Sequence, residues 1–264
     1  VARPYRIGRI SLAGILEGVG EVRQGRNLYL KPYVSTPLVR RQDDDVDFQP
    51  ELGMDLKYGV TPGITLDLTV NTDFAQVEAD QQQINLTRFP LFFPEKREFF
   101  LENSTVFRVK RVGSGFRSNN RDLIAFFSRR IGLSEGEVVP IVGGARLTGR
   151  AGKYQLGFLS MQTDGLESTP STNFSVARVR RDILQNSDLG GIFINKHESG
   201  GRYNRTYGVD SNFLFFRYLE AAAFLLKTDT EGLEGKDKAF HTFVGWNDPF
   251  YDVQVEYLSI EDNF

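Results

Sequence analysis

The chain contains no cysteine and only two histidines among its 264 residues. The absence of cysteine excludes disulfide bonds and thiolate metal sites. His197 and His241 are far apart in the sequence and lack the spacing of metal ligands, so we expect no metal site. A strong charge of one sign is also missing. The 32 basic and 34 acidic residues leave a net charge of −2, which disfavours a general nucleic-acid-binding surface.

Catalytic motifs and long apolar runs are absent as well. The sequence has no G-x-S-x-G, H-E-x-x-H or P-loop pattern, so we expect neither an enzyme nor a cofactor. No stretch approaches the ~18 consecutive apolar residues of a membrane-spanning helix. The sequence is still compatible with a membrane-spanning β-barrel, because the strands of such a barrel alternate and its mean hydropathy is low. The mean hydropathy of this chain is −0.31.

Apolar and polar residues alternate with a period of two in several segments, which is the pattern of a β-strand with two different faces. In GITLDLTVN, residues 63–71, apolar residues occupy the even positions and polar residues most of the odd ones. The same alternation occurs at 53–58, 207–215 and 251–259. A soluble β-sandwich alternates too, so the period alone does not separate the two classes.

Strand length and turn length favour a membrane barrel. Many alternating runs reach ~10 residues, the span of a tilted transmembrane strand, whereas ordinary strands average about five or six. Short connections such as NDPF (247–250) alternate with long ones such as TDTEGLEGKD (228–237), which is typical of a meander barrel. Keeping this alternation requires an additional strand at 104–112. The chain then has about 13 strands, of which 122–132 is the least regular.

We therefore predict an all-β fold, an antiparallel up-and-down transmembrane β-barrel, complete or partial. Residues 1–26 would be an N-terminal lead-in segment and residues 27–264 the barrel. A long insert at 76–103 would contain a short helix from Pro94 to about Glu102. The chain begins Val-Ala-Arg-Pro without a methionine, which suggests a mature protein or an excised piece.

The insert carries a block of charge between phenylalanines, FFPEKREFFLEN at 92–103. In a wide barrel it can fold inward, fill the lumen and meet side chains such as Asp67 and Arg150. A short amphipathic helix on the surface of a soluble core is the alternative. The predicted constriction residues are Glu95, Lys96, Arg97, Glu98, Glu102, Arg129, Arg130 and Arg146.

Aromatic residues cluster near the ends of the predicted strands, where the interfacial girdles of a membrane barrel lie. The predicted membrane-interface residues are Tyr207, Tyr218, Trp246, Tyr251 and Tyr257. Packing in a sandwich core is the alternative explanation. For the arginine-rich segments at 108–130 and 178–181, pairing with carboxylates is favoured over binding of anions or lipopolysaccharide phosphates.

Two runs resemble a known family: DVDFQPELGMDLKYGVTPGITLDLTVN and FAQVEADQQQINLTRFPLFFPEKREFFLENSTVF, within residues 45–110. They resemble a bacterial family of unknown function whose members usually follow a family-9-like carbohydrate-binding domain and are thought to form outer-membrane β-barrels. The resemblance implies a bacterial outer-membrane location and no catalytic residues. The upstream domain is absent here and family members continue past Phe264, so a fragment or partial barrel is expected.

The expected function is that of a porin-like outer-membrane protein of a Gram-negative bacterium, either a channel, a transporter or a surface scaffold. Its partners would be outer-membrane lipid, lipopolysaccharide and other envelope proteins, without nucleic acid. One alternative is a soluble or periplasmic carbohydrate-binding or hydrolytic protein with Trp246 and Tyr251 as sugar platforms. Another is an accessory subunit of a larger envelope complex. Aromatics that point outward on a convex surface would indicate lipid, whereas convergence into a cleft would indicate sugar.

Overall fold

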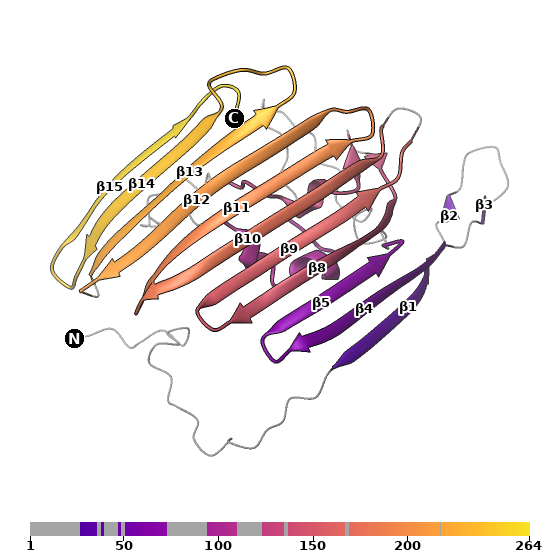
Figure 1. The fold of residues 1–264 in the computed structure, drawn as a ribbon, viewed down its shortest axis with the longest axis horizontal. Helices are drawn as coiled ribbons and strands as arrows, with labels where there is room; N and C mark the ends of the chain where they lie inside the picture. Colours follow the sequence, from indigo (N-terminus) through magenta and orange to yellow (C-terminus); the bar gives the residue numbers. More distant parts are fainter. Residues whose placement is uncertain are drawn as a thin grey trace, which may run out of the picture.

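A computed structural model describes residues 27–35, 38–39, 47–48, 51–72, 94–109, 123–134, 137–166, 169–216 and 218–264. Eleven strands of these residues form one antiparallel sheet (Figure 1). From one edge to the other they are β1 (Leu28–Ser35), β4 (Glu51–Thr61), β5 (Ile64–Val70), β8 (Ile141–Ala151), β9 (Tyr154–Thr163), β10 (Thr172–Leu184), β11 (Ser187–Glu198), β12 (Tyr203–Phe215), β13 (Leu219–Thr230), β14 (Lys238–Asn247) and β15 (Asp252–Ile260).

The remaining described strands are short. β2 (Leu38–Val39) pairs with β3 (Asp47–Phe48), and β6 (Leu133–Ser134) pairs with β7 (Glu137–Val138). The predicted all-β antiparallel fold is therefore confirmed for the described residues. β1 and β15 are the two edges of the main sheet, and within the described part of the chain the sheet is not closed. No helix of the described residues is long and apolar enough to cross a membrane.

Connections at the two ends of the main sheet differ in length, as the sequence predicts. Turns 62–63, 152–153, 185–186 and 216–218 lie at one end, whereas the longer loops 164–171 and 231–237 lie at the other. The two-residue turn after β8 uses Gly152 at a φ of 58°, a left-handed conformation that glycine adopts without steric cost.

Two predicted strands are wrong where the structure describes them. Residues 104–107 form the 3-10 helix η2 (Ser104–Phe107), and residues 128–130 form η3 (Ser128–Arg130). Val106 and Phe107 are adjacent and both buried, which an alternating strand cannot achieve against a single surface. Without these two strands the main sheet has eleven strands, fewer than predicted.

The predicted short helix is present as α2 (Glu98–Leu101), within the predicted range. Residues 110–112 and 122 of the two wrong strands lie outside the described residues. So do the lead-in segment 1–26 and residues 76–93 of the insert. The insert is thus described only from Pro94 onward.

The two faces of the main sheet differ in which side chains they expose and bury. On one, here called the outer face, apolar side chains are exposed, for example Val209 at 60% and Val253 at 61%. On the other, the inner face, charged side chains such as Asp67, at 5% exposure, and Arg146, at 1%, are buried together with apolar ones such as Leu159. A water-soluble sheet normally exposes polar side chains and rarely buries charged ones. A sheet that exposes apolar side chains on one face and buries charged groups on the other is therefore here called inverted.

Segments 94–109 and 123–134 cover part of the inner face and are drawn in magenta behind the sheet in Figure 1. η2 contacts β9 and β10. It lies so close to β9 that a Cβ at Gly157 would be 2.6 Å from Cγ1 of Val106 and 2.9 Å from Cε1 of Phe107. The apolar core is formed between these segments and the sheet, by residues that include Phe100, Phe107, Val109, Ile131, Leu159, Met161 and Val176.

Candidate functional site

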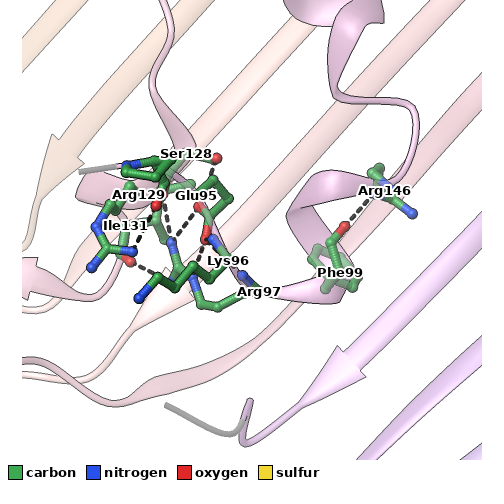
Figure 2. A network of polar contacts seen from close by, with 9 residues as sticks. Glu95, Lys96, Arg97, Phe99, Ser128, Arg129, Ile131 and Arg146 are labelled. Carbon is green, nitrogen blue, oxygen red and sulfur yellow. Dashed lines mark hydrogen bonds and ion pairs between the residues drawn. The ribbon is translucent and has the colours of Figure 1, made fainter. Parts of the chain in front are cut away.

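The candidate site is the place where segments 94–109 and 123–134 are fixed to each other and to the inner face. Its polar residues are here called the insert anchor: Asp67, Glu95, Arg97, Ser128, Arg129 and Arg146. Figure 2 shows most of them, with dashed lines for hydrogen bonds and ion pairs. Arg97, Arg129 and Arg146 are all buried, so the anchor is held by charged groups that are removed from water.

Arg97 joins the two segments. Its Nε and Nη2 donate to Oε1 and Oε2 of Glu95, both at 2.9 Å. Nη1 donates to the carbonyl oxygen of Ile131 at 2.8 Å, and Nη2 to that of Ser128 at 2.9 Å. The fork of the guanidinium thus satisfies a carboxylate and two main-chain acceptors at once, which fixes their relative geometry. Its plane also lies 4.2 Å from the ring centroid of Phe100.

Glu95 is the partly buried carboxylate of the anchor. It accepts hydrogen bonds from Oγ of Ser128 at 2.8 Å and from the backbone N–H of Lys96 and Arg97, both at 3.1 Å. Burial raises the pKa of Glu95, but the hydrogen bonds and charge of Arg97, with the bond from Ser128, outweigh it and hold the pKa below its ordinary value. Glu95 therefore stays ionised at neutral pH.

Arg129 makes a second link between the segments, because its Nη1 donates to the carbonyl oxygen of Pro94 at 3.0 Å. Arg130, its neighbour, is exposed, and its backbone N–H donates to the carbonyl oxygen of Phe127 at 3.2 Å. The two predicted arginines therefore have different positions. Arg129 is buried and belongs to the anchor, whereas Arg130 is exposed.

Arg146 fixes the insert to the sheet. In the strand register it lies opposite Asp67, and its Nη2 and Nε donate to Oδ2 of Asp67 at 2.8 and 3.1 Å. Nη1 donates to the carbonyl oxygens of Phe99 and of Glu102, the latter at 2.5 Å. The Glu102 carboxylate lies 3.5 Å from Nη2. One guanidinium thus joins the neighbouring strands β5 and β8 to the end of α2.

The other predicted constriction residues lie around the anchor. Glu102 also pairs with Lys57 of β4. Glu98 pairs with Lys31 of β1 at 2.8 Å, and the hydrogen bond and charge of Lys31 lower the pKa of Glu98. The side chain of Lys96 is exposed. Six of the eight predicted residues thus attach the segments to each other or to the sheet through their side chains: Glu95, Arg97, Glu98, Glu102, Arg129 and Arg146. Lys96, Glu98, Glu102 and Arg130 are exposed.

A second buried ionic group lies on the inner face beyond the insert, and sequence reasoning did not identify its acidic members. Arg178 donates to both oxygens of Asp210 at 2.5 and 2.7 Å, and Arg180 lies 3.4 Å from Asp210 and 3.2 Å from Asp188. These residues bridge three strands across Gly190, where an added Cβ would be 2.7 Å from Asp210 Oδ1. The pairing of arginines with carboxylates that the sequence favoured is thus present at this site. The sequence signal for this ionic group was Gly190, a position on the inner face of β11 that has no side chain and so leaves room for Arg178 and Asp210.

The predicted membrane-interface aromatics are exposed rather than gathered in a cleft. Tyr207 packs beside Phe193, with ring centroids 5.4 Å apart, and Tyr257 beside Phe240 at 6.2 Å. Tyr218 packs beside Trp246 at 6.1 Å. Tyr251 is 68% exposed. By the alternation of the strands, Tyr207, Trp246 and Tyr257 belong to the outer face.

The turn that follows β14 holds Trp246 in place. Nε1 of Trp246 donates to Oδ2 of Asp248 at 2.8 Å, and the backbone N–H groups of Phe250 and Tyr251 donate to Oδ1 of Asp248. The Trp246 hydrogen bond, followed by these backbone bonds, lowers the pKa of Asp248. The polar edge of the indole is therefore fixed toward the turn.

Within the described ranges no three histidine, aspartate or glutamate side chains are grouped so that they could hold a metal ion. His197 is exposed at the end of β11. His241 is fully buried, with Nε2 at 2.9 Å from Oε1 of Glu256 and its ring stacked on Phe224 at 5.1 Å. Neither histidine is thus part of a group of metal ligands among the described residues.

The fold and the anchor together define an all-β protein built on one open antiparallel sheet with a packed inner face. A family model described as a domain of unknown function (DUF5916) matches residues 26–153, a little under half of the chain. The match extends from the first strand of the main sheet to the turn after β8 and so includes the insert. No curated protein and no solved structure matches the chain.

Proposed function

We propose that this chain forms the wall of an outer-membrane β-barrel of a Gram-negative bacterium and that segments 94–109 and 123–134 constrict its lumen. The observation that carries the proposal is the inverted sheet. Val209 and Val253 are exposed on one face, whereas Asp67, Arg146 and Asp210 are buried on the other. A sheet with an exposed apolar face and charged groups buried on its other face suits a lipid surrounding, as in transmembrane barrels.

The length of the apolar band also supports a bilayer. On β12 the outward positions from Tyr207 to Phe215 are apolar except for Ser211, and Arg205 follows beyond Tyr207. This range matches the ~9–11 residues with which a tilted strand crosses the hydrocarbon core. Aromatic pairs mark the two ends of the band, with Tyr207 and Phe193 at one and Tyr218 and Trp246 at the other. Their outward orientation favours lipid over sugar as the contacting surface.

The insert anchor supports the proposed constriction. Arg97, Arg129 and Arg146 attach the insert through buried bonds to carboxylates and carbonyl oxygens. A segment fixed in this way narrows whatever passage the inner face encloses, and its exposed charges at Lys96 and Arg130 would contact the passing solute. A channel or transporter with a constricted lumen therefore fits the geometry better than a wide, unobstructed pore.

Heat-modifiability tests the membrane part of the proposal. Protein extracted from membranes in mild detergent is run on a gel with and without boiling. We expect a folded species whose mobility shifts only after boiling. A protein that stays soluble without detergent and shows no shift would contradict the proposal, and glycan binding would then be the next measurement.

Conductance in a planar bilayer tests the constriction. Deletion of residues 94–102 should raise the single-channel conductance, because it removes the segment that Arg146 holds against the sheet. Replacement of exposed Lys153 by glutamine in a turn of the wall is the matched control and should leave the conductance unchanged. Equal conductance of the deletion variant and the unmodified protein would exclude the constriction but not the barrel, and would favour a scaffold.

A further inference from the structure

The outer face carries a groove of about 560 Å³ over β10, β11, β12 and β13. Its size lies within the range of about 300–1,000 Å³ that is usual for sites of small ligands. The floor is formed by Ala177, Val179, Gly191 and Val209, and a wall by Phe193 and Tyr207. The groove is thus almost wholly apolar, on a face that already exposes apolar side chains.

Gly191 is the reason for the hollow. It belongs to the outer face of β11, between the outward-facing Leu189 and Phe193, and contributes no side chain. A Cβ built at this position would meet only the carbonyl oxygen of Gly208, at an ordinary distance of 3.8 Å. The space above Gly191 is therefore open, and a larger residue would fill it without displacing the backbone.

The groove has a cationic rim at one side. Lys227 lines it, and in the strand register Tyr207, Lys227 and Lys238 lie side by side on the same face of β12, β13 and β14. Like charges directly opposite each other in a sheet are unfavourable. Asp237, 3.5 Å from Lys227, offsets only part of this charge. Arg205, the next outward position on β12, lies opposite Asp229 and donates to Oδ1 of Asn195, so the cationic part of the rim is Lys227 and Lys238.

This rim lies at the end of the sheet that carries the longer loops 164–171 and 231–237. In outer-membrane barrels the longer loops are extracellular. An apolar groove that leads to a cationic rim on that side suits a lipid whose phosphates sit directly above its acyl chains in the outer leaflet. Lipopolysaccharide has this chemistry, since it carries several acyl chains on a phosphorylated sugar.

We propose that the groove over Gly191 binds an acyl chain of lipopolysaccharide, while Nζ of Lys227 contacts one of its phosphates. The inference rests on the proposed membrane location. It goes further by naming the lipid and its place on the protein surface. It also gives Lys227 an anionic partner in addition to Asp237, which lies 3.5 Å away.

Two variants test it independently. Gly191→Leu fills the groove, and Lys227→Gln removes the charge at its rim. Ala145→Leu adds the same side chain to the outer face of β8, away from the groove, and Lys153→Gln removes a lysine at the opposite rim. The full chain is folded in detergent and titrated with purified lipopolysaccharide, and bound lipid is counted by native mass spectrometry, with phosphatidylglycerol as the second probe.

We expect Gly191→Leu and Lys227→Gln each to weaken lipopolysaccharide binding about tenfold, the effect of losing one charge-assisted contact or its apolar equivalent. The two controls should bind like the unmodified protein. Unchanged binding in both test variants, or phosphatidylglycerol binding as tight as that of lipopolysaccharide, would overturn the inference.

Heat-modifiability, measured on the same samples, separates the two proposals. If the unmodified protein shows no shift, the membrane location is wrong and this inference fails with it. If it shifts and the variants bind lipopolysaccharide normally, only the lipid site is wrong. Should Gly191→Leu fail to fold, Lys227→Gln still decides, because its side chain is exposed.

Discussion

Arg146 and Asp67 lie opposite each other on β8 and β5 and form a buried ion pair of 2.8 Å, from which the same guanidinium also reaches the end of α2. Arg146→Ala would leave the Asp67 carboxylate buried without its partner. Loss of one member of such a pair costs about 3–5 kcal/mol in the free energy of unfolding. Denaturant unfolding followed by mobility on a gel should show this loss.

The matched control for Arg146 is Arg150 on the same strand. Arg150 pairs with Asp182 at 2.7 Å, but its side chain is 55% exposed. An exposed pair contributes about 0–1 kcal/mol, so Arg150→Ala should hardly change the free energy of unfolding. Similar losses in the two variants would mean that Arg146 does not hold the insert.

Gly157 is the second position at which the insert depends on the sheet. Gly157→Ala should destabilise the protein by about 1–3 kcal/mol, because its methyl group would overlap Val106 and Phe107 of η2. Gly191→Ala on the outer face is the control, since its methyl group meets only an atom at 3.8 Å. Thermal unfolding of both variants measures the difference, and an equal midpoint would show that η2 does not rest on Gly157.

Acid should loosen the insert through Glu95. Its pKa in the folded protein lies below the ordinary value of 4.5, so folding favours the ionised form. The stabilisation is fully present above pH 4.5 and is lost as the pH falls through the lowered pKa. Limited proteolysis of the insert should therefore accelerate in that acidic range.

Glu95→Gln removes the titrating group and should give faster cleavage at neutral pH with a shallower dependence on acid. Glu234→Gln, in the exposed loop before β14, serves as the control and should keep the original profile. A Glu95→Gln profile as steep as that of the unmodified protein would assign the pH dependence to other carboxylates.

Val244 on the outer face of β14 distinguishes a lipid surrounding from water. In a bilayer, Val244→Arg places a charge on the lipid side and should cost about 2–4 kcal/mol if the residue lies near the midplane. In water, an arginine at a position that is already 48% exposed should change stability by at most about 0.5 kcal/mol. Folding yield into lipid vesicles, compared with yield into detergent, is the measurement, and an unchanged yield in vesicles would argue for a soluble sheet.

The strands of the main sheet were predictable because a strand with two different faces alternates with a period of two in water and in lipid alike. Residues 63–71 and 207–215 show this pattern. The errors at 104–109 and 123–132 arose where turn alternation was used without a matching pattern. Val106 and Phe107 are neighbours that both face β9 and β10, and Asn103 before them has a φ of 54°.

The composition of the insert anchor was predictable, and its bonding was not. Glu95, Arg97 and Arg146 stand out in the sequence as charges among apolar residues. The acceptors at Ile131, Ser128 and Phe99 are main-chain carbonyl oxygens. Every residue type supplies such an oxygen, so the sequence does not indicate which residues are the acceptors. The ionic group of Arg178 and Asp210 depends on strand register, which only the structure supplies.

The same carbonyl acceptors have a consequence for how such a protein can diverge. Pro94, Phe99, Glu102, Ser128 and Ile131 each offer an oxygen that every amino acid possesses. Exchange of these side chains therefore leaves the acceptors in place, as long as the three arginines persist. The insert is therefore free to acquire new side chains at these positions, while its attachment to the sheet is inherited unchanged.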